Sequence, residues 1–177
     1  MLVTKLADFL IMSLLPKFML GLVLLMAGSA TASAGVKVGQ PFPDLASYAL
    51  EGNLPARAGQ VVLVDFWATW CAPCKASFPA YSELQRELAG RGFVLLAVSV
   101  DQTPRPYEEF LQRYTPAFAV VRDGTQKLVS ALQVPAMPTS YLIDRRGVLR
   151  AVHSGFYGAE TVRTLREEII RLLEEKL

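Results

Sequence analysis

Residues 61–75 read VVLVDFWATWCAPCK, and this stretch decides how the chain folds. Its first seven residues form an apolar, β-branched run of strand length that only Asp65 interrupts, which is typical of a central strand buried on both faces. Cys71 and Cys74 follow this run, and apolar side chains then recur at three- and four-residue steps up to Leu88. The stretch therefore predicts a buried strand that leads through a two-cysteine turn into a helix.

Cys71 and Cys74 are the only cysteines in the 177-residue chain. A structural disulfide is one interpretation, but a bridge across so short a loop constrains the unfolded chain only weakly. Half of a zinc site is another, but zinc usually takes four ligands and the chain adds one histidine, His153. A helix N-terminus beside Cys71 favours its thiolate, which disulfide exchange needs. We therefore favour a redox-active dithiol, with Cys71 as the exposed attacking thiol and Cys74 as the deeper resolving thiol, and expect no metal site.

The N-terminal part of the sequence has the pattern of an export signal. Lys17 precedes a short apolar run, and a tail of small residues then ends in Ala32-Ser33-Ala34, the form of a signal-peptidase site. The pattern predicts a signal peptide over residues 1–34, with cleavage before Gly35; an uncleaved membrane anchor over the same residues is the alternative. Export would place the remaining domain, residues 35–177, where disulfide chemistry is possible.

Composition and charge set further bounds on this domain. The chain is 52% hydrophobic and carries a formal net charge of +2, which fits one folded domain plus an apolar leader. No run of basic residues marks a nucleic-acid or polybasic membrane surface, so we expect no nucleic-acid partner. Membrane contact is expected only through residues 1–34, if they stay attached.

The periodicity along the domain predicts an alternation of strands and helices. The expected strands cover residues 45–50, 61–67, 93–100, 117–121, 139–143 and 148–154. The expected helices cover residues 73–88, 103–114, 125–132 and 159–177. Crossovers between the earlier strands require parallel pairing, whereas the last two strands, joined by a short turn, form an antiparallel hairpin. The predicted fold class is therefore α/β, with a mixed central sheet flanked by helices.

Two segments resemble the signatures of the thioredoxin superfamily. Residues 64–75 (VDFWATWCAPCK) resemble the active-site stretch of thioredoxins, and residues 134–143 (VPAMPTSYLI) resemble their second signature, in which the proline is cis. The leader, the opening GQPFPD at residues 39–44 and the extra helix after Val100 resemble the exported TlpA/ResA/CcmG-like branch. The resemblance implies a thioredoxin fold with an N-terminal strand extension and a central helical insertion.

The resemblance also implies roles for individual residues. Cys71 would be the nucleophile and Cys74 the resolving thiol. Pro138 would be cis and lie against the sulfurs, leaving the backbone of Met137 to pair with an extended substrate segment. Asp65 matches the buried acid of thioredoxins, and burial should raise its pKa so that it can take the proton from Cys74.

Other residues complete the expected site. Trp70 should cover the sulfurs, and Thr139 should contact the substrate together with Trp70 and the Met137 backbone. The second tryptophan, Trp67, should pack in the core. Lys75 either pairs with the buried acid or is a solvated lysine at the helix start, and the sequence leaves both interpretations open.

One departure from the family pattern concerns haem-related substrates. Many members that act in cytochrome maturation carry a Glu just after the strand that corresponds to residues 93–100. This chain reads Asp101-Gln102-Thr103 there. Asp101 is the residue that could substitute for the Glu, although its position differs.

The sequence therefore predicts an extracytoplasmic, for example periplasmic, thiol:disulfide oxidoreductase that uses no cofactor and mainly reduces protein disulfides. Its partners would be disulfide-containing exported proteins, with apocytochrome c as one candidate. A membrane electron donor of the DsbD/CcdA type would re-reduce it. Three alternatives stay open: a net dithiol oxidant, a thiol peroxidase, although the chain lacks the usual Thr-x-x-Cys pattern, and a copper- or haem-handling binding protein.

Overall fold

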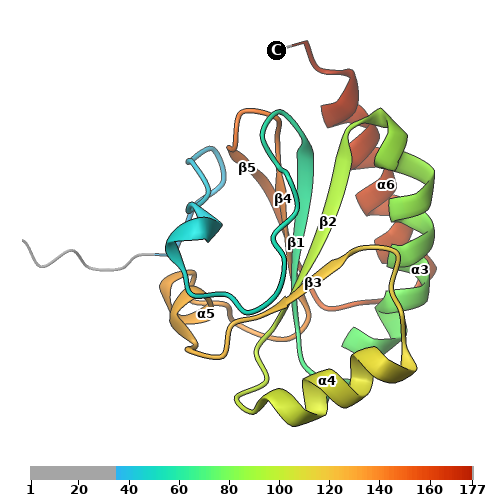
Figure 1. Cartoon of the computed structure of the whole chain (residues 1–177). Helices are drawn as coiled ribbons and strands as arrows, with labels where there is room; N and C mark the ends of the chain where they lie inside the picture. Colours follow the sequence, from blue (N-terminus) through green and yellow to red (C-terminus); the bar gives the residue numbers. More distant parts are fainter. Residues whose placement is uncertain (1–34, 177) are drawn as a thin grey trace, which may run out of the picture. The chain divides into compact units, whose positions relative to one another are not determined.

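The computed structural model describes residues 35–176, so the predictions for residues 1–34 lie outside the described part of the chain. In this domain five strands form one sheet in the order β3-β2-β1-β4-β5 (Figure 1). The strands are β1 (Val61–Trp67), β2 (Phe93–Ser99), β3 (Ala119–Arg122), β4 (Thr139–Ile143) and β5 (Leu149–Ser154). The α-helices are α3 (Ala72–Leu88), α4 (Pro104–Arg113), α5 (Lys127–Ala131) and α6 (Ala159–Glu174), and two short 3-10 helices are η1 (Leu45–Ser47) and η2 (Ala89–Arg91).

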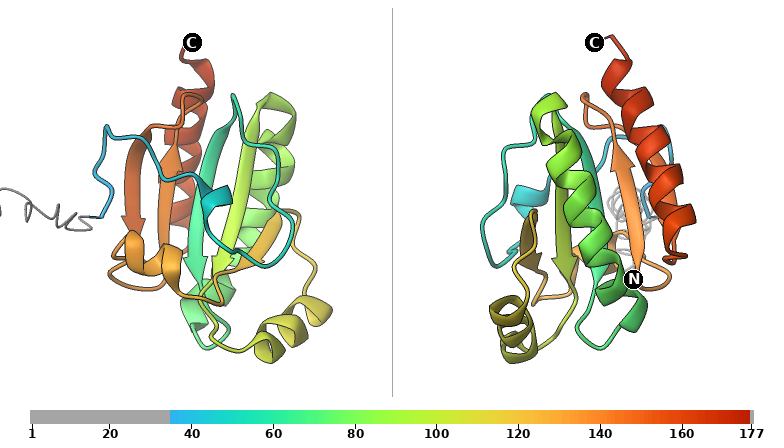
Figure 2. Two further views of the ribbon diagram at one scale, coloured as in Figure 1. Left: turned by 60° about the vertical axis from the view of Figure 1, so that its left-hand side comes forward. Right: turned by 90° about the vertical axis from the view of Figure 1, so that its right-hand side faces the viewer.

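The sheet is mixed, as the sequence predicts. β1 pairs in parallel with β2, and β2 pairs in parallel with β3. β4 runs antiparallel to both of its neighbours, β1 and β5. α3 and α6 cover one face of the sheet, whereas α5 and the N-terminal segment lie over the other (Figures 1 and 2). This arrangement is a thioredoxin fold.

The central position of β1 follows from its sequence. All seven of its residues are buried, and such a strand is stable only between two others with both of its faces covered. Beneath α3, the rings of Trp67 and Phe78 pack edge to face with their centroids 4.7 Å apart. Phe110 of α4 packs on Trp67 at a centroid distance of 4.8 Å. The predicted helical insertion therefore exists and contributes to the core beside the cysteine turn.

The predicted strand over residues 45–50, and with it the N-terminal strand extension, is wrong. This segment forms η1, in which the Asp44 side chain accepts a hydrogen bond from the Ala46 N–H (3.0 Å) and the Ser47 hydroxyl donates to the Asp44 carbonyl (2.6 Å). Such local bonds compete with a strand ladder, and the prolines just before the segment cannot donate to one. Within the described domain, isolated bridges to the sheet lie only at the flanks of this segment, where Pro41 pairs with Val148 and Glu51 with Arg122.

The other predicted elements exist, with ends that differ by a few residues. α4 begins at Pro104, one residue after the start of the predicted helix, and the Thr103 side chain before it makes no capping hydrogen bond. α6 is shorter than predicted, because regular helix ends at Glu174. Within residues 35–176, no helix combines the length and the hydropathy that crossing a bilayer requires.

Candidate active site

The two cysteines form a disulfide at the start of α3. Their Cα atoms are 5.3 Å apart, and Cys71 is the N-cap residue of the helix. The Cys74 N–H donates a hydrogen bond to the sulfur of Cys71 at 3.3 Å. Cys71 is 5% exposed and Cys74 is fully buried, so Cys71 is the more accessible of the two. In the reduced protein the same N–H and the positive end of the helix would stabilise a thiolate on Cys71.

Asp65 lies in the middle of β1 and is completely buried. The Ser140 hydroxyl, opposite it on β4, donates a 2.6 Å hydrogen bond to Oδ1, whereas Oδ2 has no partner within the described residues. Burial raises the pKa of Asp65 to about 7, and the bond from Ser140 opposes this rise only in part. Near neutral pH, Asp65 can therefore both accept and release a proton.

The polar contacts of Asp65 place it beneath the cysteine-bearing helix. The hydroxyl of Tyr81 on α3 lies 3.3 Å from the Ser140 hydroxyl that binds Asp65. Tyr81 follows Cys74 by seven residues, or about two helical turns, so both side chains lie on the same face of α3. Asp65 thus faces the side of α3 that also carries the resolving thiol. Lys75 is exposed and forms no ion pair with Asp65, which agrees with a solvated lysine.

The second predicted signature forms a loop at the end of the sheet where β1 finishes and β4 begins. The Met137–Pro138 peptide bond is cis, and the Pro138 carbonyl accepts a hydrogen bond from the Gly155 N–H at 2.8 Å. Thr139 is fully buried and its hydroxyl donates to the Ala136 carbonyl at 2.8 Å, so it holds the loop in place rather than forming its surface. The backbone N–H and C=O of Met137 make no hydrogen bond to other residues of the described domain.

The two tryptophans have different surroundings. Trp67 is fully buried, as predicted. Trp70, next to Cys71, is 70% exposed, so most of its surface is open to solvent and to a binding partner. Trp70 and the free backbone of Met137 therefore offer an apolar side chain and a hydrogen-bonding edge at the end of the sheet that carries the disulfide.

Asp101 anchors the loop that precedes Cys71. It accepts hydrogen bonds from the Thr69 N–H (3.1 Å), the Thr69 hydroxyl (2.8 Å) and the Ser99 hydroxyl (2.7 Å). Asp101 is 4% exposed, so these bonds are shielded from water. Its carboxylate is thus committed to the loop, and its backbone is held by Arg122, which donates to the carbonyls of Asp101 and Gln102 at 3.0 Å.

The contact between Thr69 and Asp101 could have been predicted from the expected pairing of the two strands, although it is part of no motif. Trp67 and Ser99 are paired at the ends of two parallel strands. Thr69 lies two residues after Trp67, and Asp101 lies two residues after Ser99. Because the two strands are parallel and paired at these residues, Thr69 and Asp101 leave the same edge of the sheet side by side. Arg122, on the next strand, is fixed in turn by Glu51, whose carboxylate accepts from Nη2 at 2.6 Å.

The single histidine lies away from this chemistry. His153 is on β5, as predicted, and its Nε2 is 2.7 Å from a carboxylate oxygen of Glu168 on α6. In the part of the chain that the structure describes, His, Cys, Asp and Glu side chains form no group of three or more that could hold a metal ion.

Comparison with known sequences identifies a family. The model of the AhpC/TSA family matches residues 38–152. The chain is 32% identical over 142 residues to the thiol-disulfide oxidoreductase ResA of Geobacillus thermodenitrificans, which covers 78% of this chain and 82% of that relative. It is 30% identical over 158 residues to the thioredoxin-like protein YneN of Bacillus subtilis, which covers 80% of this chain and 92% of YneN.

Solved structures show the same arrangement of strands and helices. A Chlorobium tepidum protein assigned as the thiol:disulfide interchange protein DsbE superposes with a TM-score of 0.72 at 33% identity, covering 78% of this chain and 99% of that one. The exposed lipoprotein thioredoxin Etrx1 of Streptococcus pneumoniae gives a TM-score of 0.56 at 28% identity, covering 63% of this chain and 87% of that one.

Ionisation of Asp65 should make the oxidised protein less stable as the pH rises from about 4 to about 7. The unfolded chain releases this proton near the ordinary pKa of 3.8, whereas the folded protein holds it up to a pKa of about 7. Between these two values a rise in pH therefore stabilises the unfolded state relative to the folded state. About three pKa units correspond to roughly 4 kcal/mol. Urea unfolding of the wild type and of Asp65→Asn between pH 4 and 8 measures the effect. Asn keeps an acceptor for Ser140 but does not ionise, so parallel pH profiles for the two proteins would contradict this expectation.

Removal of the Asp101 carboxylate should loosen the loop before Cys71. Asp101→Ala leaves the Thr69 N–H and two hydroxyls without their acceptor, and we expect a loss of about 2–4 kcal/mol in unfolding free energy and slower disulfide exchange. Thr69→Val is the matched control, because it removes one of these bonds and should cost about 1 kcal/mol. An Asp101→Ala protein as stable and as fast as the wild type would show that the loop does not depend on this anchor.

Proposed function

Because this chain belongs to the AhpC/TSA family of thioredoxin-like proteins, we propose that it is an exported enzyme that reduces disulfides in other exported proteins. The chain is a thiol:disulfide oxidoreductase, in line with the names of its relatives. The observation that carries the proposal is the Cys71–Cys74 pair at the start of α3, where the Cys74 N–H points at the Cys71 sulfur. Reduced, this pair is a nucleophile with its resolving thiol one helical turn away.

The geometry supports a two-step exchange. The Cys71 thiolate attacks one sulfur of a substrate disulfide, and a mixed disulfide forms while the other substrate sulfur leaves as a thiolate and takes a proton. The Cys74 thiol then loses its proton to the Asp65 carboxylate and attacks the Cys71 sulfur. The second substrate thiolate leaves, and the enzyme ends in the disulfide form. In total, two electrons pass to the substrate. A pKa of about 7 suits Asp65 to accept the proton that the Cys74 thiol releases.

The surroundings of Cys71 favour reduction over oxidation. A strongly oxidising dithiol needs a strongly stabilised thiolate. Here the Cys71 sulfur accepts one backbone N–H, and in the described domain no cationic side chain bonds to it. The buried acid Asp65 adds negative charge beneath the same helix once it ionises. A membrane donor of the DsbD/CcdA type would return the two electrons that each cycle uses.

The surface near the disulfide suits an extended protein segment. The free backbone N–H and C=O of Met137 can pair with such a segment, and the exposed ring of Trp70 can pack on an apolar side chain beside it. The Asp101 carboxylate is already bonded to Thr69 and Ser99, so it is not free to act as the Glu of cytochrome-maturation members does. We therefore favour a range of exported proteins as substrates, and apocytochrome c is only one candidate among them.

The reduction potential of the Cys71/Cys74 couple should lie below about −200 mV, in the range of reductants. Equilibration with glutathione or thioredoxin standards measures it, and the reduced protein should also reduce insulin disulfides. A potential near about −120 mV would instead make the protein a net oxidant and overturn the direction proposed here.

Substitution Cys74→Ser should trap substrates as mixed disulfides on Cys71, because the resolving thiol is gone. Cys71→Ser is the matched control and should trap none. When the tagged full chain is expressed in its own host, the trapped partners should be exported proteins, and the N-terminus of the mature chain should read Gly35. Trapping of cytoplasmic proteins alone, or no trapping at all, would contradict the proposal.

A further inference from the structure

A row of polar side chains crosses three strands of the sheet beneath α3. Asp65 on β1 lies directly opposite Ser140 on β4, and Ser140 lies directly opposite His153 on β5. On the other side of Asp65, the paired residue of β2 is Ala97. Residues that lie opposite each other in a sheet share a face, so the row lies on the face that α3 and α6 cover (Figure 2). The part of the row nearest to the cysteines is therefore shielded from water.

Two hydroxyl groups form a chain that ends on the carboxylate of Asp65. The Ser140 hydroxyl donates to Oδ1 of Asp65 at 2.6 Å, and the Tyr81 hydroxyl lies 3.3 Å from the Ser140 oxygen. A hydroxyl has one proton to donate, and Ser140 gives its own to the carboxylate, so Tyr81 is the donor in the second bond. Burial raises the pKa of Tyr81, and the nearby charge of Asp65 raises it further. Tyr81 therefore stays protonated and remains a donor.

The two carboxylate oxygens of Asp65 have different surroundings. Oδ1 is held by Ser140, whereas Oδ2 is buried and has no hydrogen-bond partner within the described residues. A proton on Oδ1 would force both hydroxyls to turn round, because the carboxyl group would then be the donor. A proton on Oδ2 leaves both bonds as they are. Oδ2 is thus the oxygen that the network leaves ready to accept a proton.

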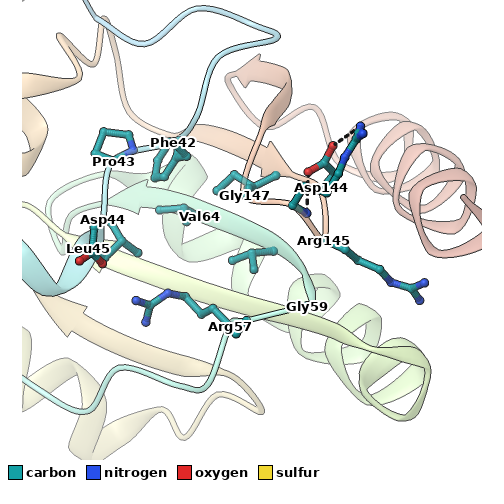
Figure 3. A pocket seen from close by; sticks show the side chains of 14 residues that line it. Phe42, Pro43, Asp44, Leu45, Arg57, Gly59, Val64, Asp144, Arg145 and Gly147 are labelled. Atoms are coloured by element: carbon teal, nitrogen blue, oxygen red, sulfur yellow. Dashed lines mark hydrogen bonds and ion pairs between the residues drawn. The ribbon is translucent and has the colours of Figure 1, made fainter. Parts of the chain in front are cut away.

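A cavity on the other face of the sheet is closed off from Asp65. It has a volume of about 350 Å³ and is lined in part by Val62 and Val64 (Figure 3). Successive residues of a strand point to opposite faces, and Val64 is itself fully buried, so β1 separates the cavity from the acid. Transfer of a proton to Asp65 therefore takes place on the α3 side.

Cys74 is the thiol on that side. It is fully buried and lies on the same face of α3 as Tyr81, about two helical turns before it. His153, the other titratable side chain of the row, has its Nε2 2.7 Å from a carboxylate oxygen of Glu168 on α6. The buried residues of α6 do not titrate; they are Thr161, Leu165, Ile169, Leu172 and Leu173. The resolving thiol is thus the group placed to supply a proton to Asp65.

We propose that Ser140 and Tyr81 are positioning residues for the second step of the exchange: they hold Asp65 with its Oδ2 ready for the proton of the resolving thiol. This inference rests on the proposed function, because it concerns a step of that reaction. The proton of Cys74 passes to Oδ2, and the Cys74 sulfur bonds to the Cys71 sulfur. The bond from Cys71 to the substrate then breaks, and its electron pair leaves on the substrate sulfur. The hydroxyl chain favours the ionised carboxylate, which is the form that can accept this proton.

Stopped-flow mixing of the reduced full chain with excess dithiobis(nitrobenzoate) separates the two steps. Attack by Cys71 releases one thionitrobenzoate, and attack by Cys74 on the mixed disulfide releases the second. Ser140→Ala should leave the first release unchanged. It should raise the pH at which the second release is half-maximal by about one unit, because the bond that lowers the pKa of Asp65 is lost. On the acid side of this midpoint, the second release should be about tenfold slower than in the wild type.

Three further variants separate the hydroxyl chain from general loosening of the domain. Tyr81→Phe removes the second bond but keeps the ring that packs on Phe156, so it should shift the midpoint in the same direction by a smaller amount. Ser140→Thr keeps the hydroxyl and should retain the wild-type midpoint. Ser82→Ala is the matched control: it removes another buried hydroxyl, one that accepts from the Ala117 N–H at 3.3 Å, and should leave both releases unchanged.

A second background shows whether the hydroxyls act through the acid. In Asp65→Asn the second release should lose its midpoint near neutral pH, and Ser140→Ala should then have no further effect. An unchanged midpoint in both Ser140→Ala and Tyr81→Phe would overturn the positioning role. So would an equal shift in Ser82→Ala, or an effect of Ser140→Ala in the Asp65→Asn background. Absence of the first release would instead overturn exchange at Cys71, on which the proposed function rests.

Discussion

The complete burial of β1 governs how the domain is built. With all seven residues buried, β1 must lie between β2 and β4 and beneath α3. The chain leaves such a strand only at its end, so the cysteine turn is fixed at the edge of the sheet. The same burial takes Asp65 out of water and raises its pKa to about 7. The burial of β1 therefore explains both the position of the two thiols and the raised pKa of Asp65.

Polar residues at the ends of neighbouring strands then hold the site together. Ser140 on β4 binds Asp65 on β1, and Asp101, just after β2, binds Thr69, just after β1. Both bonds cross between strands, so they form only when the strand register is correct. Both bonds are shielded from water. In such surroundings, leaving a polar group without a partner costs more free energy than a typical hydrogen bond contributes to stability. The active-site loop is in this way coupled to the assembly of the whole sheet, and through Arg122 and Glu51 to the N-terminal segment.

Sequence patterns predicted most of this fold because most of its elements have a strong local signal. β1 and β4 have the predicted bounds, and the other helices and strands after residue 60 differ by a few residues at their ends. The pattern failed over residues 45–50, where apolar spacing suggested a strand but Asp44 and Ser47 bond to the local backbone instead. Apolar spacing reports which side chains face the core, not whether a neighbouring strand has free backbone groups to pair with. The sequence pattern does not predict that Asp101 anchors the active-site loop, because its partner, Thr69, is 32 residues away in the sequence.

The groups that carry the chemistry are already visible in the sequence: two cysteines two residues apart at a strand-to-helix junction, a carboxylate within the apolar strand before them, and a proline signature further along. These features depend on residue type and spacing alone. The local strand-to-helix geometry then places the two cysteines at the N-terminus of a helix. The surroundings of that dithiol, in contrast, follow from the folded domain. Burial depth, the bond from Ser140, its contact with Tyr81 and the anchoring of the loop by Asp101 all join segments far apart in the chain. Their energies depend on the water that folding excludes, and no single segment excludes it alone.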